Sequence, residues 1–317
     1  MSWNNIISIV NLAIAYSAPL IIIALGGLFS ERSGVVNIGL EGLLGVGAFA
    51  SAVVILQFGP SLGGATIYVS LIAAAIAGGL FSLLHAFASV TMKADQVVSG
   101  TAINLLAPAL TYFLSRNLTG GKAIIEVSGL GYFKFPLLWR IPVIGQLFFE
   151  RSYTTTFIVL AIVLLSWYVL YYRPFGLRLR ACGENPQAAD SLGINVIKMR
   201  YLGVTISGIL AGLGGGILLN TVLRQFSDLV YTGFGFLALA ALIFGKWKPW
   251  NVLGAAIFFG FARTVADSSQ IITALKDMPN IIFHTFPYVA TLIALVIFSK
   301  NAVGPRAAGE PYDPGKR

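Results

Sequence analysis

The sequence predicts an all-α polytopic membrane protein with about nine transmembrane helices. Hydrophobic residues make up 57% of its 317 residues, charged residues only 10%, and the mean hydropathy is +0.83. No ordinary soluble domain of this length has such a composition. A helix needs about 20 residues to cross the hydrocarbon core. Nine apolar runs approach this length: 11–29, 38–57, 66–90, 97–114, 154–172, 201–219, 230–245, 250–266 and 281–299.

The first run carries no charge and follows no basic residue, since Arg32 is the first Lys or Arg of the chain. A cleavable signal peptide starts with a positively charged region. We therefore expect the first run to be retained as a transmembrane helix.

The second and seventh runs differ in kind from the others. The second opens SGVVNIGLEGLLGVGAF from Ser33, whereas the seventh is short and opens YTGFGFLALAALIFG from Tyr231. Glycine-interrupted or short spans in corresponding positions of two halves point to the central site of a transporter. Aligning Gly34 with Gly233 also indicates a faint internal repeat.

The sixth run has two adjoining faces of small residues, each with a spacing of four: Gly208, Gly212 and Gly216 on one, and Gly203, Ser207, Ala211 and Gly215 on the other. Small residues let helix backbones approach closely in lipid. We expect these faces to pack within the subunit, with a dimer seam as the alternative.

Residues 115–153 form a long connection that we place outside the cell. Within it, the stretch 133–149, FKFPLLWRIPVIGQLFF, is apolar but is broken by Pro136 and Pro142. Prolines inside a span remove helix hydrogen bonds. The stretch is therefore predicted to be interfacial or re-entrant near the mouth of a pathway. The alternative is a tenth span, which would invert the first half of the chain.

The polar segment 173–200 lies between two long apolar runs, and a short helix is predicted at its centre. Asn185 suits the N-cap, Pro186 suits the first helical position, and Gly193 suits a left-handed exit. The single cysteine, Cys182, lies in this segment and excludes an internal disulfide.

Basic residues test the orientation of the spans. With segment 173–200 inside, nine spans place the amino terminus outside and the tail 300–317 in the cytoplasm. The inside segments then carry thirteen Lys and Arg, and the outside segments seven. This excess favours the orientation, because cytoplasmic loops are enriched in Lys and Arg. The net charge of +9 comes from 21 Lys and Arg against 12 Asp and Glu. In a membrane protein such an excess is typical of cytoplasmic loops, so it does not indicate nucleic-acid binding.

Glu41 is one turn inside the second span, where an ionised carboxylate costs roughly 2.5–3.5 kcal/mol on insertion scales. It should therefore face protein or water. One hypothesis places it on a substrate pathway. The other is a structural carboxylate near the inner interface, paired with Arg32 or with donors from a loop.

Five further residues are candidates for a substrate pathway. Amide side chains can bond ribose hydroxyls or a purine edge, and aromatic side chains can stack on a base or narrow the pathway. Packing within the subunit is the alternative for every one of these residues, which are Asn37, Asn104, Asn220, Phe234 and Phe236.

The sequence offers no sign of an enzyme. His85 and His284 have no carboxylate or thiol at ligand spacing, so we expect no metal site. A Walker A sequence is missing, since Gly214 to Gly216 lack the lysine. We expect the chain to bind no cofactor and to hydrolyse no ATP by itself.

Three stretches, one of which contains a short loop motif, carry a resemblance to a known family. Gln187 to Gly193 resembles the E-A-A-x-x-x-G loop of ABC-transporter permeases, with Gln187 in place of the first Glu. Residues 31–49, 179–216 and 233–250 look like the inner-membrane permeases of simple-sugar and nucleoside ABC importers. The run ERSGVVNIGLEG from Glu31 looks most like the nucleoside branch, whose partners include a basic-membrane-protein-type lipoprotein receptor.

The resemblance implies a bacterial plasma-membrane protein with one permease domain, residues 1–299. Its expected partners are a second homologous permease in a heterodimer, a cytoplasmic ATPase subunit with two fused nucleotide-binding halves that binds ATP and Mg²⁺, an extracellular substrate-binding lipoprotein, and membrane lipid. The implied ATPase-contact positions are Pro186, Gln187, Ala188, Ala189, Asp190 and Gly193. The implied cargo is a nucleoside.

Other classes stay open at this point. One alternative is an ABC permease for a ribose-like monosaccharide. An ion-driven secondary transporter is another, although only Glu41 and Arg263 lie within spans as ionisable candidates, and both are near span ends. A scaffold that recruits a soluble partner without transport is a third.

Overall fold

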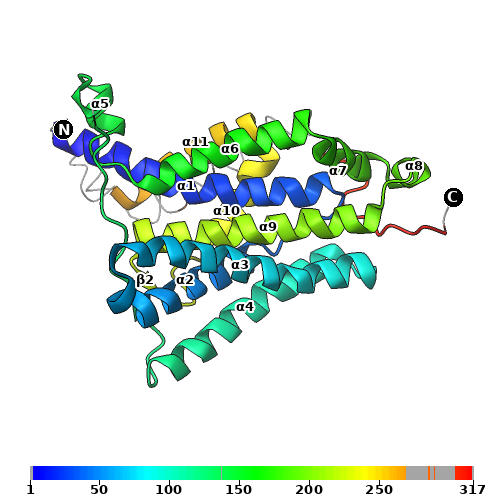
Figure 1. Ribbon diagram of the computed structural model, residues 1–317, viewed down its shortest axis with the longest axis horizontal. Helices are drawn as coiled ribbons and strands as arrows, with labels where there is room; N and C mark the ends of the chain where they lie inside the picture. Colours follow the sequence, from blue (N-terminus) through cyan, green and yellow to red (C-terminus); the bar gives the residue numbers. More distant parts are fainter. Residues whose placement is uncertain (1–2, 137, 269–284, 286–288, 290–303, 316–317) are drawn as a thin grey trace.

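The computed structural model describes residues 3–136, 138–268, 285, 289 and 304–315, which form a helical bundle with one two-stranded sheet. In Figure 1, α1 (Trp3–Arg32) runs through the middle of the bundle, between α6 (Thr154–Tyr172) and α9 (Val196–Leu218). The other elements are α2 Leu40–Leu62, a 3-10 turn Gly63–Ala65, α3 Thr66–Ala86 with its π-helical extension Phe87–Thr91, α4 Gln96–Leu118, β1 Ile125–Glu126, a 3-10 turn Leu138–Arg140, α5 Ile144–Phe148, α7 Pro174–Glu184, α8 Pro186–Ser191, a π-helical extension of α9 at Leu219–Leu223, β2 Gln225–Phe226, α10 Phe234–Phe244 and α11 Pro249–Ser268.

The helices confirm the predicted fold class. Five segments of the described chain are long and apolar enough to cross a membrane: Asn5–Arg32, Leu40–Thr91, Gln96–Leu118, Thr154–Tyr172 and Val196–Leu223. The second of these has 52 residues and contains both α2 and α3, which are joined at the 3-10 turn. Helices also occupy the seventh and eighth predicted runs. The ninth run, apart from residues 285 and 289, lies outside the described residues, so the total of nine spans stays a prediction.

The small faces of α9 pack within the subunit, as predicted. A Cβ at Gly212 would collide with the Ala74 carbonyl oxygen of α3 and lie 2.9 Å from the Cα of Gly78. On the adjoining face, a Cβ at Gly215 would collide with the Leu44 carbonyl oxygen of α2. Only glycine allows backbones to approach this closely. Helices α2 and α3 therefore both pack directly on α9.

The connection 119–153 lies at one end of the bundle. Its β1 pairs antiparallel with β2, with Ile125 opposite Phe226. The described part of stretch 133–149 holds a 3-10 turn and the five-residue α5 rather than a spanning helix, which contradicts a tenth span there. Figure 1 places α5 at the same end as the amino terminus, and α7, α8 and the carboxyl-terminal tail at the other end.

Two elements begin deep in the bundle after irregular backbone. Helix α2 starts only at Leu40, after the segment 33–39, and α10 has just 11 residues, about 16 Å of helix. Gly34 and Gly233 have φ values of +94° and +93°, a conformation that glycine adopts without steric cost. The two glycines aligned in the faint repeat therefore both precede a late-starting helix. Each helix starts a few residues after the first residue of the predicted run.

Candidate functional site

Glu41 joins the starts of α2 and α10. Its carboxylate accepts hydrogen bonds from the backbone N–H groups of Gly233, Gly235 (2.6 Å) and Phe236 (3.3 Å). The first N–H groups of a helix have no partner within it, and the positive end of the helix dipole favours an anion there. The side chain is almost fully buried. Of the two hypotheses for Glu41, the structural one matches these contacts, with the donors coming from a loop and helix start and not from Arg32.

Asn37 and Asn104 hold the irregular segment 33–39. Asn37 donates to the Ser207 hydroxyl (2.9 Å) and accepts from the N–H of Gly39 (3.0 Å). Asn104, from α4, accepts from the N–H of Gly42 (2.8 Å) and donates to the carbonyl of Ile38 (2.9 Å). Backbone without helical hydrogen bonds needs such partners at membrane depth.

Asn220 lies apart from this group. Its amide nitrogen donates to the Ser51 hydroxyl (2.9 Å) and to the Gly216 carbonyl (2.8 Å). Ser51 is ten residues beyond Glu41 along α2, about 15 Å at the helical rise. The structure therefore brings Asn37, Glu41 and Asn104 together at the start of α2, whereas Asn220 pairs farther along the bundle.

The two phenylalanines at the start of α10 have different surroundings. Phe234 is buried and stacks on Tyr16, with ring centroids 5.9 Å apart, while the Arg263 guanidinium lies 5.6 Å from its ring. Phe236 is 50% exposed. Phe236 is thus the member of the pair with surface to offer to a ligand or to a second subunit.

His85 is buried and hydrogen-bonded within the protein, which fits a structural role. Its ring nitrogens lie 2.9 Å from the Ser99 hydroxyl and 3.0 Å from the Val36 carbonyl. His284 lies outside the described residues. Among the residues that the structure describes, no group of three or more His, Cys, Asp and Glu side chains could hold a metal ion.

At the end of the bundle opposite α5 (Figure 1), helix α8 has the predicted caps. The Asn185 side chain accepts from the N–H of Ala188 (3.0 Å), Pro186 is the first helical residue, and Gly193 has φ +79°. Pro186 and Ala189 face the protein and are buried, while Gln187, Ala188 and Asp190 are exposed.

Leu192, which directly follows α8, is a residue that sequence reasoning missed. It is 82% exposed, more than any other large apolar side chain in the described part of the chain. A single exposed leucine does not mark an interaction site by itself, but this one extends the exposed face of α8 by an apolar side chain. The signal in the sequence was one leucine inside an otherwise small and polar loop.

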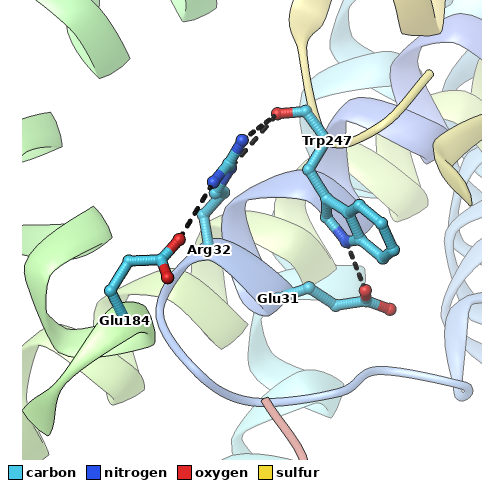
Figure 2. A network of polar contacts seen from close by, with 4 residues as sticks. All are labelled: Glu31, Arg32, Glu184 and Trp247. Carbon is cyan, nitrogen blue, oxygen red and sulfur yellow. Dashed lines mark hydrogen bonds and ion pairs between the residues drawn. The ribbon is translucent and has the colours of Figure 1, made fainter. Parts of the chain in front are cut away.

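The structure also contains α7, where the sequence predicted a polar loop. Figure 2 shows how its last residue joins a polar network. Glu184 lies 3.5 Å from the Arg32 guanidinium, which donates to the Trp247 carbonyl at 2.9 Å. The Trp247 indole in turn donates to Glu31 at 2.5 Å. This network fastens the α7–α8 unit to the end of α1 and to the turn between α10 and α11.

This arrangement defines a class: a helical membrane protein with irregular backbone in its centre and a capped, exposed helix at one end. The chain matches, over residues 8–298, the family described as the permease component of the branched-chain amino acid transport system. Because the match covers most of its length, the chain belongs to this family.

Individual relatives are similar over nearly the whole chain. The guanosine ABC transporter permease NupQ of Bacillus subtilis is 50% identical over 311 residues, which cover 98% of this chain and 97% of the relative. The nucleoside ABC transporter permease NupC of Lactococcus lactis subsp. cremoris is 43% identical, with 98% of each chain covered. A putative glucose ABC transporter permease of Haloferax volcanii, TsgC13, is 31% identical, with 90% of each covered. The predicted resemblance to ABC permeases is confirmed.

Proposed function

We propose that this chain is the transmembrane permease subunit of an ATP-driven importer of nucleosides. The observation that carries this proposal is the 50% identity to a guanosine permease across 98% of the chain. A second relative, at 43% identity, is named for nucleosides. The glucose permease is less similar, at 31%, which makes the monosaccharide reading the second candidate.

A permease of this family works in a transporter complex with other permease and ATPase subunits. We assign to the complex a heterodimer of two homologous permeases, an ATPase with two nucleotide-binding halves that binds ATP and Mg²⁺, and an extracellular substrate-binding lipoprotein. Nucleotide binding would rock the permeases between outward-facing and inward-facing states. This chain contributes the translocation path and no hydrolysis.

The ATPase would contact α8. The exposed side chains Gln187, Ala188 and Asp190 line its outer face, and Gly193 ends it with an open left-handed turn around which a Cβ would meet no atom within 4 Å. We add Leu192 to this surface because of its exposure. Pro186 and Ala189 would act from the inner face, by seating the helix on the permease.

The pathway would run past the start of α2 and α10. We assign Asn37, Glu41 and Asn104 to holding the irregular backbone there, since their polar atoms bond the segments described above. Phe236 is the side chain we expect to face the pathway or the second permease. Phe234 packs behind this part of the pathway, against Tyr16, whereas Asn220 links α2 to the extension of α9 farther along the bundle.

The orientation follows from the same assignment. If α8 meets a cytoplasmic ATPase, the tail at its end of the bundle is cytoplasmic, and the amino terminus and α5 are outside. The excess of Lys and Arg on the α8 side supports this orientation.

The decisive experiment is uptake of labelled guanosine and uridine by cells with and without this chain, each repeated with excess unlabelled ribose. Loss of ribose-insensitive nucleoside uptake in the deletion strain, restored by the wild-type gene, is expected. Unchanged nucleoside uptake with lost ribose uptake would contradict the proposal in favour of a monosaccharide permease. Inhibition by a protonophore at constant ATP, without inhibition by vanadate, would instead indicate an ion-driven transporter.

A further inference from the structure

The carboxyl-terminal tail, residues 304–315, is not a free extension. Gly304 lies against the Trp247 ring, and the N–H of Ala307 donates to the Gly183 carbonyl of α7 at 2.9 Å. Farther on, Asp313 pairs with Lys93 at 3.0 Å, in the turn before α4. The tail therefore crosses the end of the bundle and touches the turn between α10 and α11, helix α7 and the turn before α4.

Tyr312 is the centre of these contacts. Only 6% of it is exposed, and it packs in one apolar cluster with Cys182 of α7, Ala189 of α8 and Val196 of α9. Burial and the nearby Asp190 carboxylate raise the pKa of its hydroxyl. Tyr312 thus packs beneath α8, against the buried Ala189 and next to Asp190. A groove of about 290 Å³ opens beside it, lined by Asp190, the stretch 193–197, Tyr312 and Pro314.

Arg200, next to Tyr312, is 1% exposed although it is a cation. Its Nη1 donates to the Glu310 carbonyl of the tail at 2.8 Å, and its guanidinium lies 5.9 Å from the Tyr312 ring. Among the described residues, nothing accepts a hydrogen bond from its Nε or Nη2. A buried cation with so few partners is costly, so Arg200 depends on the tail for the stabilisation that it has.

Arg200 also touches the irregular segment before α2. A Cβ at Gly34 would lie 2.9 Å from Arg200 Nη2, so the guanidinium fills the space beside the left-handed turn that begins this segment. Six residues along the chain from Gly34 begins α2, with Glu41 in its first turn. The contacts from α8 through Tyr312 and Arg200 to Gly34 are therefore continuous.

We propose that Tyr312 is a positioning residue: with the tail, it holds α8 on Arg200, so that displacement of α8 by the ATPase moves the segment 33–39. This inference rests on the proposed function, because it assumes that an ATPase subunit engages α8. It goes further by giving the tail a role in coupling. Chains of packed side chains are one route by which displacement at one site reaches another, and the variants below test whether these contacts form such a route.

The test uses the complete transporter, with both permeases, ATPase and receptor, reconstituted in vesicles. Nucleoside uptake and ATP hydrolysis are measured together. For Tyr312→Ala we expect the complex to assemble and hydrolyse ATP, while uptake per ATP falls about tenfold, a size typical of lost coupling between sites. Tyr312→Phe keeps the ring over Arg200 and should retain most of the coupling. Arg306→Ala, at an exposed tail position, is the matched control and should leave uptake per ATP unchanged.

Cys182 reports separately whether the tail has moved. It is the only cysteine of the chain and is fully buried beneath Tyr312. Burial raises the pKa of its thiol to about 11, and thiols react as thiolates, so maleimide labelling of the wild-type complex should be slow at pH 7.5. Tyr312→Ala should speed labelling about tenfold or more by admitting water to the thiol. Tyr312→Leu, which keeps apolar cover, serves the same comparison if the alanine variant is not recovered.

Uptake per ATP within about twofold of wild type for Tyr312→Ala and Tyr312→Leu, with Cys182 already exposed in the alanine variant, would overturn the role of the tail. A wild-type complex that hydrolyses ATP and transports no nucleoside would instead contradict the proposed function. The two failures are thus distinguishable.

Discussion

Helices α8 and α10 meet the same physical need in opposite ways. Each starts with N–H groups that have no partner within the helix. At α8 the acceptor is Asn185, three residues from the N–H that it binds. At α10 the acceptor is Glu41, 192 residues away from Gly233 along the chain. Beside water, a local amide oxygen is enough, whereas at membrane depth a carboxylate from another helix replaces the water that is missing.

This difference explains why one region is left available to partners and the other is not. The cap of α8 uses one side chain and leaves Gln187, Ala188 and Leu192 on the surface. The cap of α10 uses a carboxylate that would otherwise be a conspicuous candidate for binding a substrate. The interior residues Asn37, Glu41 and Asn104 thus form hydrogen bonds to irregular backbone. Four variants test the contrast between the local cap of α8 and the remote cap of α10.

The largest effect is expected for Glu41→Ala. It would remove the acceptor of three backbone N–H groups, one buried and two partly buried, and a buried donor left unpaired costs about 1–3 kcal/mol. We expect a strongly lowered melting temperature in detergent and little folded protein in the membrane. Glu126→Ala, at an exposed position of β1, is the control and should melt like the wild type. An unchanged melting temperature for Glu41→Ala would refute the remote cap.

A smaller loss of stability is expected for Gly235→Ala. The added Cβ would lie 2.5 Å from the backbone N and Cα of Glu41, so α10 must move away from α2, and overpacking of this kind costs about 1–3 kcal/mol. Thermal melting measures the effect. Gly254→Ala is the matched control, because a Cβ there meets nothing within 4 Å. Equal melting temperatures for the two variants would show that α10 and α2 pack less closely at Gly235 than described.

Gly193→Asp should act on transport more than on stability. Position 193 has φ +79° with open space around it, and aspartate tolerates the left-handed region at a cost of about 1 kcal/mol. We expect nucleoside uptake to fall about tenfold or more while the protein reaches the membrane at its usual level. Gly120→Asp, at φ +67° and equally open, should transport normally. Normal uptake by Gly193→Asp would remove α8 from the ATPase contact.

The smallest effect is expected for Asn185→Ala. Loss of an N-cap costs about 1 kcal/mol, and it falls on a helix of six residues at the surface. Global melting should hardly change, whereas limited proteolysis should cleave the 185–193 region faster than in the wild type. An effect on melting as large as that of Glu41→Ala would mean that the local cap supports the bundle, and the contrast would fail.

Several features were predictable because they depend on neighbours in sequence. Hydropathy located the helices, since crossing a membrane requires a minimum apolar length. The four-residue spacing in α9 predicted close packing, although not that α3 would contact one face and α2 the other. Proline positions predicted that 133–149 does not span. The exposure of Leu192 was missed because it depends on which other segments cover the residue. Helix α7 was missed because one of its faces packs against helices that are distant in sequence.

The sequence alone determined the helical membrane fold, the caps and exit of α8, and the small faces of α9, because each follows from composition or from contacts within one or two helical turns. Only the tertiary structure decided that Glu41 caps α10, that Asn37 and Asn104 hold the segment before α2, and that Tyr312 of the tail lies between α8 and Arg200. Burying a polar group costs free energy unless it forms hydrogen bonds, and which partners it finds depends on how distant helices come together.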